Sequence, residues 1–226
     1  MIKAIFFDAA GILYTRGGHT EEFALDLLQD EGFSTELPSD QLAIQMTLRS
    51  RANQGIVGHD VYWDQFLLMR GVNDPQQRKE FATRIIDYSN DILPISGARE
   101  ALTALKERGF LLGIITDTMY PVEWKMRRLE KAGVAEFIDI VACSTNLGAH
   151  KPDPAIYAFA IEQATLTQNE TAFVGHLGVE LEGAQKAGMV TVAIGYDPDT
   201  RADYYCKSLM DMLDIPPLQR KSAEPV

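Results

Sequence analysis

An aspartate at the end of an apolar run is the first residue of this sequence that could carry chemistry. In the stretch FFDAAGILY, the apolar residues from Ala4 to Phe7 lead directly into Asp8. A carboxylate at the mouth of a buried strand can act as a nucleophile, although an acid there is often a turn or helix-capping residue. The residue two positions farther on is Ala10, so this stretch contains no second acid. Asp8 is therefore a candidate nucleophile that lacks an acid beside it.

Three more groups of polar residues follow short apolar runs. Thr116 and Asp117 end the run FLLGIIT, Lys151 lies in GAHKPDP, and His176 and Glu180 follow the run TAFVG. Each group has an ordinary explanation when it is taken alone. A threonine at a strand end usually makes local hydrogen bonds, and an exposed lysine near a helix start costs little. Open α/β sheets bind ligands at the carboxyl ends of their strands, so these positions together with the aspartate indicate one site.

The apolar runs predict the fold. Five short runs are bounded by turn residues and rich in Ile, Val and Phe: IKAIFF, FLLGIIT, FIDIVAC, TAFVG and VTVAIG. Such runs are typical of strands buried on both faces. Helical patterns lie between the later runs: GAREALTALKERG places Leu102 and Leu105 on one stripe, and KPDPAIYAFAIEQA offers Asp153 as N-cap before Pro154. This alternation predicts an α/β fold with a doubly wound, parallel, Rossmann-like sheet.

A long helical stretch interrupts that alternation. Residues 15–93 look helical almost throughout, and the turn residues of TRGGH and LPISG mark the two ends of the stretch. The stretch follows the first strand, at the end where such sheets bind ligands. We therefore expect residues 15–93 to form a helical cap domain over an α/β core domain of residues 1–14 and 94–226. The alternative is that the insert merely adds hydrophobic core.

Four residues of this insert attract attention. Tyr62 and Trp63 are expected in the interior of the cap. Arg49 and Arg51 invite an anion-binding role. Because residues two apart on a helix point to different faces, at most one of these arginines could reach the site.

Charge and composition exclude some partners. The formal net charge is -11 and the sequence pI is about 4.8, which repels nucleic acid phosphates and anionic membranes. Two cysteines, Cys143 and Cys206, fit a reducing cytosol better than a disulfide framework. The N-terminal apolar run is too short for a signal peptide, and no run reaches the roughly 18 apolar residues of a membrane span. We expect a cytoplasmic protein with a small-molecule substrate and no nucleic acid or membrane partner, and the sequence leaves a homodimer open.

In this order and on this predicted architecture, the polar residues resemble the motifs of the haloacid dehalogenase (HAD) superfamily, over nearly the whole chain. The insert resembles the helical cap of the phosphoglycolate-phosphatase-like and dehalogenase-like members, and the stretches KPDP and GAQKAGM are typical of that branch. The resemblance implies that Asp8 is the nucleophile and that Thr116 hydrogen-bonds the transferred group. It also implies that Lys151 offsets charge on the nucleophile and substrate, and that Glu180 is the second acid of the last motif.

Two positions depart from the superfamily's pattern. Its phosphatases carry a DxD motif whose second aspartate is the general acid and base, and this position is Ala10 here. Their last motif usually begins GD with a Mg²⁺-binding aspartate, and the corresponding residue is His176. A proton-transfer group typically contributes about 10²- to 10⁴-fold, and Mg²⁺ prefers oxygen ligands, so phosphomonoester turnover should be impaired. Asp8 and Glu180 could still hold Mg²⁺ loosely, so we expect either no required cofactor or weakly bound Mg²⁺.

Both departures leave Asp8, Thr116 and Lys151 in place, which resembles the dehalogenase branch. Members of that branch have no second aspartate and need no metal: the aspartate attacks carbon, halide leaves, and water cleaves the ester. They usually carry an aromatic residue at the position of Ala10 and a small polar residue at the position of His176. The imidazole could itself be the base, since a reference pKa of about 6.5 suits proton transfer at neutral pH, or it could be a spectator.

The sequence therefore predicts a HAD-type hydrolase in which Asp8 attacks a small, anionic substrate under the cap, with weak or no Mg²⁺ dependence. Ala9, Ala10 and Asp117, which follow the nucleophile and the threonine, are assigned to substrate binding. Two alternatives stay open: an impaired Mg²⁺-dependent phosphatase and a non-catalytic binding protein of the same fold.

Overall fold

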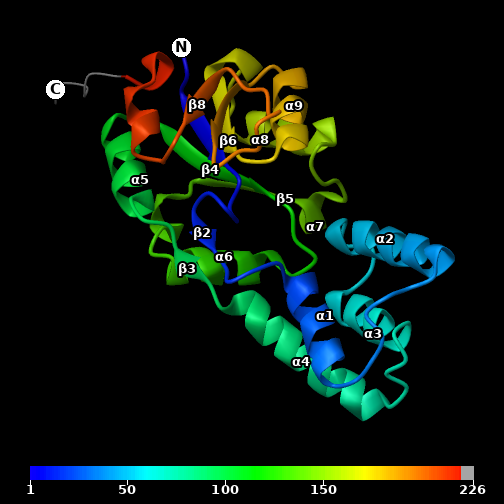
Figure 1. Cartoon of the computed structure of the whole chain (residues 1–226). Coiled ribbons are helices and arrows are strands. Elements are labelled where there is room, and N and C mark those ends of the chain that lie inside the picture. Colours follow the sequence, from blue (N-terminus) through cyan, green and yellow to red (C-terminus); the bar gives the residue numbers. More distant parts are fainter. Residues whose placement is uncertain (220–226) are drawn as a thin grey trace.

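A six-stranded parallel sheet forms the centre of the molecule (Figure 1). The computed structural model describes residues 1–219, so residues 220–226 of the predicted core domain lie outside the described part. The strands run in the order β5-β4-β1-β6-β7-β8, and each neighbouring pair is parallel. The prediction of a doubly wound α/β fold is confirmed, with the five apolar runs as five of the strands. The bounds are β1 (Ala4–Phe7), β4 (Leu111–Thr116), β5 (Ile140–Cys143), β6 (Thr171–Gly175), β7 (Val190–Ile194) and β8 (Tyr204–Cys206).

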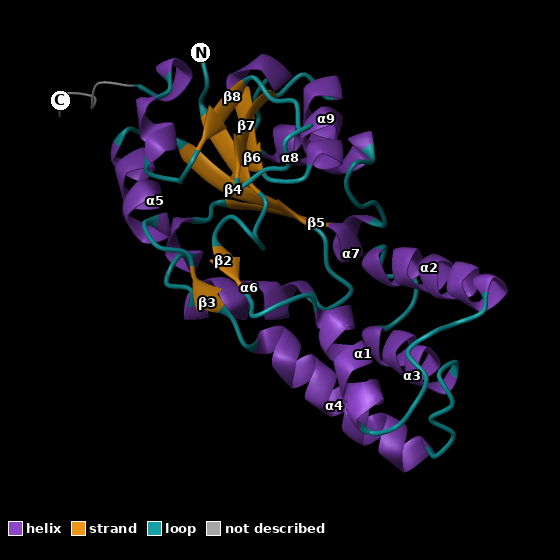
Figure 2. Cartoon of the chain, viewed as in Figure 1, coloured by secondary structure: helices purple, strands orange, loops and turns teal. Residues whose placement is uncertain are grey.

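Alternate residues of the strands face opposite sides of the sheet and build two separate cores. Ile5 and Phe7 of β1 lie in one hydrophobic cluster, whereas Ala4 and Phe6 lie in another, as the period of two along a strand requires. Two helices cover each face (Figure 2). The first cluster is covered by α5 (Ala98–Glu107) and α6 (Val122–Lys131), and the second by α8 (Pro154–Gln163) and α9 (Gly178–Lys186).

The predicted start of α8 is confirmed. Asp153 is the N-cap and accepts a hydrogen bond from the backbone N of Ala155 at 2.9 Å, and Pro154 is the first helical residue. Side-chain capping and the fixed φ of proline both favour a helix start at this point. The loop that ends at this cap carries Lys151, so the helix start restricts where that lysine can lie.

The segment between β1 and α5 contains the predicted helices. Their bounds are α1 (Thr20–Asp30), α2 (Ser39–Asn53), α3 (His59–Leu68) and α4 (Pro75–Asn90). They share a hydrophobic cluster that includes the buried Tyr62 and Trp63, as expected. Figure 2 shows them gathered at one end of the molecule, away from the sheet. Gly55, just after α2, lies so close to the short helix after β5 that a Cβ would overlap the carbonyl oxygen of Thr145. The four helices therefore lie on the side of the strands' carboxyl ends.

An antiparallel ribbon that the sequence did not predict joins the two ends of this helical segment. Its strands are β2 (Tyr14–Thr15) and β3 (Leu93–Pro94). Because residues far apart in the chain pair here, the chain leaves and re-enters the region of the sheet at one place.

Shorter elements complete residues 1–219. They are α7 (Ser144–Leu147) and the 3₁₀ turns Ala135–Phe137, Gln168–Glu170, Asp211–Asp214 and Pro216–Leu218. No helix within the described residues is long and apolar enough to cross a membrane. Cys143 and Cys206 are both buried, and neither forms a disulfide.

Candidate active site

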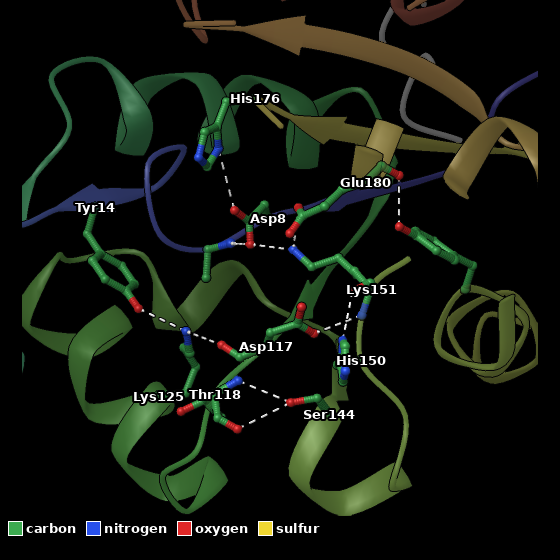
Figure 3. A network of polar contacts seen from close by, with 12 residues as sticks. Asp8, Tyr14, Asp117, Thr118, Lys125, Ser144, His150, Lys151, His176 and Glu180 are labelled. Carbon is green, nitrogen blue, oxygen red and sulfur yellow. Dashed lines mark hydrogen bonds and ion pairs between the residues drawn. The ribbon is translucent and has the colours of Figure 1, made fainter. Parts of the chain in front are cut away.

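Five of the polar residues singled out in the sequence meet at the carboxyl edge of the sheet (Figure 3): Asp8, Asp117, Lys151, His176 and Glu180. Thr116 is the last residue of β4 at the same edge. Strand β1 lies between β4 and β6, and Phe7 is in register with Ile114 and Val174. The backbone N of Asp8 extends this pairing by donating to the carbonyl oxygen of Val174 at 2.8 Å. The residues that follow these three strands are neighbours for this reason, although they are far apart in the chain.

A buried lysine joins two carboxylates at the centre of the site. Lys151 Nζ donates to Asp8 Oδ1 at 2.8 Å and to Glu180 Oε2 at 2.8 Å, and its side chain is 1% exposed. Burial opposes the charged ammonium, but Asp8 and then Glu180 attract it and together raise the pKa of Lys151 above its usual value. The lysine is therefore a fixed positive charge that two carboxylates share.

The positive charge near the second carboxylate, Glu180, is too small to compensate it fully. Burial raises its pKa to about 7; Lys151 lowers the pKa, and Asp8 raises it. One lysine cannot fully compensate two buried carboxylates, so a proton on Glu180 relieves the repulsion. Glu180 is thus held in place by Lys151 and carries a proton for part of the time near neutral pH.

We expect Glu180→Gln to reduce the pH dependence of folding. The pKa of Glu180 in the folded chain is raised above its ordinary value of 4.5, so the folded chain retains a proton that the unfolded chain releases. This contribution to stability is complete below the ordinary pKa and is lost as the pH rises through about 7. The native protein should lose about 1–3 kcal/mol more than the variant between about pH 5 and pH 8. Urea unfolding of both proteins across that range measures this, and parallel curves would contradict it.

The carboxylate of Asp8 is held on one side. Oδ1 accepts hydrogen bonds from Lys151 Nζ and from the backbone N of Ala9, the latter at 2.9 Å. Oδ2 accepts no hydrogen bond from residues 1–219 and lies 3.6 Å from Nδ1 of His176. The carboxylate is therefore oriented by hydrogen bonds to one oxygen only. The predicted substrate-binding role of Ala9 stays a prediction, and its N–H is already used by Asp8.

A hydroxyl group without a partner ends the neighbouring strand. Thr116 is fully buried, and its Oγ1 forms no hydrogen bond within residues 1–219. A buried hydroxyl left unpaired costs about 1–3 kcal/mol, so such groups normally have a partner. A ligand oxygen at this edge of the sheet would supply that partner.

The imidazole of His176 packs on the loop after Asp8. A Cβ at Gly11, where φ is +84°, would lie 2.8 Å from Cε1 of the ring, so only glycine leaves room for it. Nδ1 is buried and has no hydrogen-bond partner among the described residues. Burial lowers the pKa of His176, the charge of Asp8 raises it, and that of Lys151 lowers it again, with a net decrease. The ring is therefore mainly neutral at neutral pH and can accept a proton.

Asp117 contacts the loop that carries Lys151, and Ala10 lies in the loop that follows Asp8. Asp117 is half-buried, and its Oδ1 accepts a hydrogen bond from the backbone N of Lys151 at 3.1 Å. Burial raises the pKa of Asp117 despite the opposing effect of Lys151. Ala10 is half-buried and forms a bridge with Tyr14 in the loop. The carboxylate of Asp117 thus positions the loop of the lysine, and a substrate contact of Asp117 or Ala10 stays a prediction.

A cavity of about 550 Å³ lies between the helical segment and the loop after β4. Asp117 and Thr118 line it from the sheet side, and residues of α1, α2 and α3 line it from the other side. Arg49 is a lining residue and forms an ion pair with Glu21 at 2.8 Å, whereas Arg51 does not line the cavity. Of the two arginines, Arg49 alone lines this cavity, and an anion-binding role for it stays a prediction.

Two residues of this cavity were missed by the sequence reasoning. Lys125 and Arg128 lie on α6 and are 2% and 3% exposed. Lys125 Nζ donates to the hydroxyl of Tyr14 at 3.1 Å and to the carbonyl oxygen of Asp117 at 3.4 Å (Figure 3). Lys125 and Arg128 are three residues apart, so they lie on the same face of the helix as Leu129, which packs in the core. This helical spacing was the only signal in the sequence.

The side chains present fit Mg²⁺ poorly. Within residues 1–219 no group of three or more His, Cys, Asp or Glu side chains is placed to hold a metal ion. The carboxylates of Asp8 and Glu180 already share the ammonium of Lys151, and the next side chain is the imidazole of His176. Mg²⁺ requires several oxygen ligands in near-octahedral geometry, which this set does not offer.

The fold and the motif order define a hydrolase family. The family model of the haloacid dehalogenase-like hydrolases matches residues 5–194, so the chain belongs to this family. The resemblance seen in the sequence is therefore confirmed.

Individual relatives include both phosphatases and dehalogenases. Glyceraldehyde 3-phosphate phosphatase of Methanopyrus kandleri is 29% identical over 202 residues, which cover 86% of this chain and 84% of that protein. (S)-2-haloacid dehalogenase 4A of Burkholderia cepacia is 30% identical over 122 residues, 53% of this chain and 51% of that protein. The crystal structure of 2-haloacid dehalogenase from Pseudomonas syringae pv. Tomato DC3000 has a TM-score of 0.67 at 23% identity, covering 94% of this chain and 96% of that one. This last likeness supports the fold.

Proposed function

We propose that this chain hydrolyses a small, anionic substrate through a covalent intermediate on Asp8, with weak or no Mg²⁺ dependence, and that residues 15–93 form a cap over the site. The supporting observation is the asymmetry of the Asp8 carboxylate. Oδ1 is held by Lys151 and the backbone N of Ala9, and Oδ2 has no donor among the described residues. A carboxylate oriented in this way, beside a cation and an unpaired hydroxyl, is arranged for nucleophilic attack.

In the first step, Oδ2 of Asp8 forms a bond to the electrophilic atom, and the leaving group departs with the electron pair of its own bond. Thr116 donates a hydrogen bond to a substrate oxygen, which gives its buried hydroxyl a partner. Lys151 holds the carboxylate in place and offsets its negative charge.

In the second step, water attacks the carbonyl carbon of the aspartyl ester and passes a proton to Nδ1 of His176. The protonated imidazole returns the proton to the departing oxygen, so the product leaves as an alcohol and Asp8 is released as an acid that ionises. The lowered pKa of His176 supports this role, because the ring is then neutral and able to accept the proton.

A leaving group that requires no proton suits this site best. Halide is a weak base and leaves as the anion, whereas the alkoxide of a phosphate ester needs a general acid. Ala10 stands where that acid would lie and has no proton to give. The similarity to a 2-haloacid dehalogenase therefore makes 2-halo acids the first substrate class to test.

A phosphatase is the second candidate, and a sequence comparison favours it. The relative that matches 86% of this chain is a glyceraldehyde 3-phosphate phosphatase. Without an acid at position 10, such an enzyme would turn over about 10²- to 10⁴-fold more slowly than one that has it.

A hydrolysis screen distinguishes these functions. The native protein is offered 2-halo acids, phosphate esters and other small esters, each with Mg²⁺ and with a chelator. Turnover of a halo acid that survives chelation supports the proposal. Turnover of phosphate esters that the chelator abolishes identifies a phosphatase, and no turnover of any compound favours a binding protein.

We expect the native protein to bind Mg²⁺ with a dissociation constant above about 1 mM, because two of the superfamily's acids are replaced. The double variant Ala10→Asp/His176→Asp should bind at least about tenfold more tightly, since it restores two hard oxygen ligands. Isothermal titration at neutral pH measures both. Submillimolar affinity in the native protein would contradict the weak Mg²⁺ dependence and favour the phosphatase.

A further inference from the structure

Two buried cations in the wall of the cavity have no carboxylate partner. Lys125 and Arg128 are at least as buried as Lys151, which pairs with Asp8 and Glu180. Neither takes part in any ion pair formed within residues 1–219. Burying a charge is costly unless an opposite charge or several hydrogen bonds compensate it.

The hydrogen bonds of these cations go to neutral groups. Arg128 uses Nε and Nη2 for the side chains of Ser89 and Asn90, at 3.0–3.1 Å. Lys125 Nζ uses Tyr14 and a backbone carbonyl, which leaves one of its three N–H groups free. These contacts orient both cations without neutralising either.

The acidic residues that line the same cavity are already occupied. Glu21 forms an ion pair with Arg49 and accepts a hydrogen bond from the hydroxyl of Tyr62. Glu22 accepts a hydrogen bond from the backbone N of His19 at 3.1 Å. Asp117 accepts from the backbone of the Lys151 loop. A third lining cation, Arg16, binds only the hydroxyl of Thr20, at 2.9 Å, among the described residues. Among the described residues the lining therefore holds four basic side chains, Arg16, Arg49, Lys125 and Arg128, against three carboxylates, and only Arg49 forms an ion pair with one of them, in a chain whose net charge is -11.

The chemistry of Tyr14 agrees with this excess of positive charge. Burial raises the pKa of its hydroxyl, but Lys125 and then Arg128 lower it, and the net effect is a decrease. A tyrosine buried in apolar surroundings would show the opposite shift.

We propose that Lys125, Arg128 and Arg16 bind an oxyanion of the substrate, a carboxylate or a phosphate, that is separate from the group attacked by Asp8. This inference rests on the proposed function and specifies its substrate: a molecule with an electrophilic end at Asp8 and an anionic end in the cavity. Asp117 connects the two places, because its carbonyl oxygen binds Lys125 and its carboxylate binds the backbone of Lys151. A volume of about 550 Å³ is within the range of small-molecule sites.

Titration calorimetry with inorganic phosphate and, separately, with acetate tests this site without any turnover. The native protein should bind at least one of them at low ionic strength, and the tighter one identifies the class of anion. Lys125→Met and Arg128→Met should each weaken that binding about tenfold or more, because each removes a charge-assisted hydrogen bond. Arg16→Gln should weaken it as well, and this half-buried side chain is the safer change for folding. Arg127→Met is the matched control, since Arg127 is exposed on the same helix and should leave binding unchanged.

The Asp8→Asn variant separates this inference from the proposed function. It should bind the anion as the native protein does, even if Asp8 proves to have no catalytic role. Anion binding that is lost in Asp8→Asn but kept in the folded Lys125, Arg128 and Arg16 variants would place the anion at the nucleophile and overturn the inference. Failure of the native protein to bind either anion at millimolar concentration would overturn it too.

Discussion

Replacing Asp8 by asparagine is expected to abolish turnover while leaving the fold intact. The amide has nearly the shape of the carboxylate but is a far weaker nucleophile, and loss of a nucleophile costs at least about 10³-fold in rate. The variant should stay folded because Lys151 keeps its ion pair with Glu180. Rates for the substrate found in the screen and thermal melting of both proteins measure the two expectations. Asp139→Asn is the control. Asp139 directly precedes β5, at the amino ends of the strands, whereas Asp8 follows the carboxyl end of β1, so this variant should keep full activity.

Isotope labelling tests the covalent step directly. A single turnover in ¹⁸O-water should place the label in the carboxylate of Asp8, because water attacks the aspartyl carbon. Mass spectrometry of the peptide that contains Asp8 detects it. If Asp8→Asn keeps most of the turnover and the peptide carries no label, the covalent mechanism is wrong. His176 or Glu180 acting on a water molecule would then be the leading candidate.

Replacing Lys151 by methionine is expected to cause the largest loss of stability. The change leaves Asp8 and Glu180 buried without their shared cation, and breaking a buried ion pair in this way costs about 3–5 kcal/mol. The variant should become more stable as the pH falls from about 8 to 5, because protonation of Glu180 removes its repulsion with Asp8. Turnover should also fall, because the nucleophile is no longer held in orientation. Urea unfolding at several pH values measures both effects.

An exposed ion pair provides the matched control for this variant. Lys106 pairs with Asp139 at 2.7 Å, but both side chains are 33% exposed. Lys106→Met should therefore cost no more than about 1 kcal/mol. If Lys151→Met costs the same as Lys106→Met and its stability does not depend on pH, the lysine is not the central charge of the site.

Much of the fold follows from local patterns. The runs of Ile, Val and Phe become strands, because a segment buried on both faces needs apolar side chains on both. Helix α8 begins where Asp153 and Pro154 predict it, because capping depends on neighbours in the chain. The ribbon of β2 and β3 and the short strand β8 are different. The strands β2 and β3 are distant in sequence, and strands of two or three residues, such as these and β8, are too short to show a periodic pattern.

The candidate site likewise combines residues that the sequence identifies with an arrangement that only the folded sheet provides. Asp8, Thr116 and Lys151 could be selected from the sequence because each stands at a recognisable strand or helix end. Their positions next to one another follow from β1 lying between β4 and β6, which is a property of the sheet.

The charge balance of the cavity and the packing of the His176 ring could not be predicted without the tertiary structure. Lys125 and Arg128 look like ordinary surface cations of a polar helix, and their burial depends on the packing of α6 against the start and end of the helical segment. His176 lies against Gly11 because β1 and β6 are neighbours in the sheet, so the loops that follow them meet. A sequence states which charges and donors exist, but whether each has a partner depends on distances between segments that meet only when the chain folds.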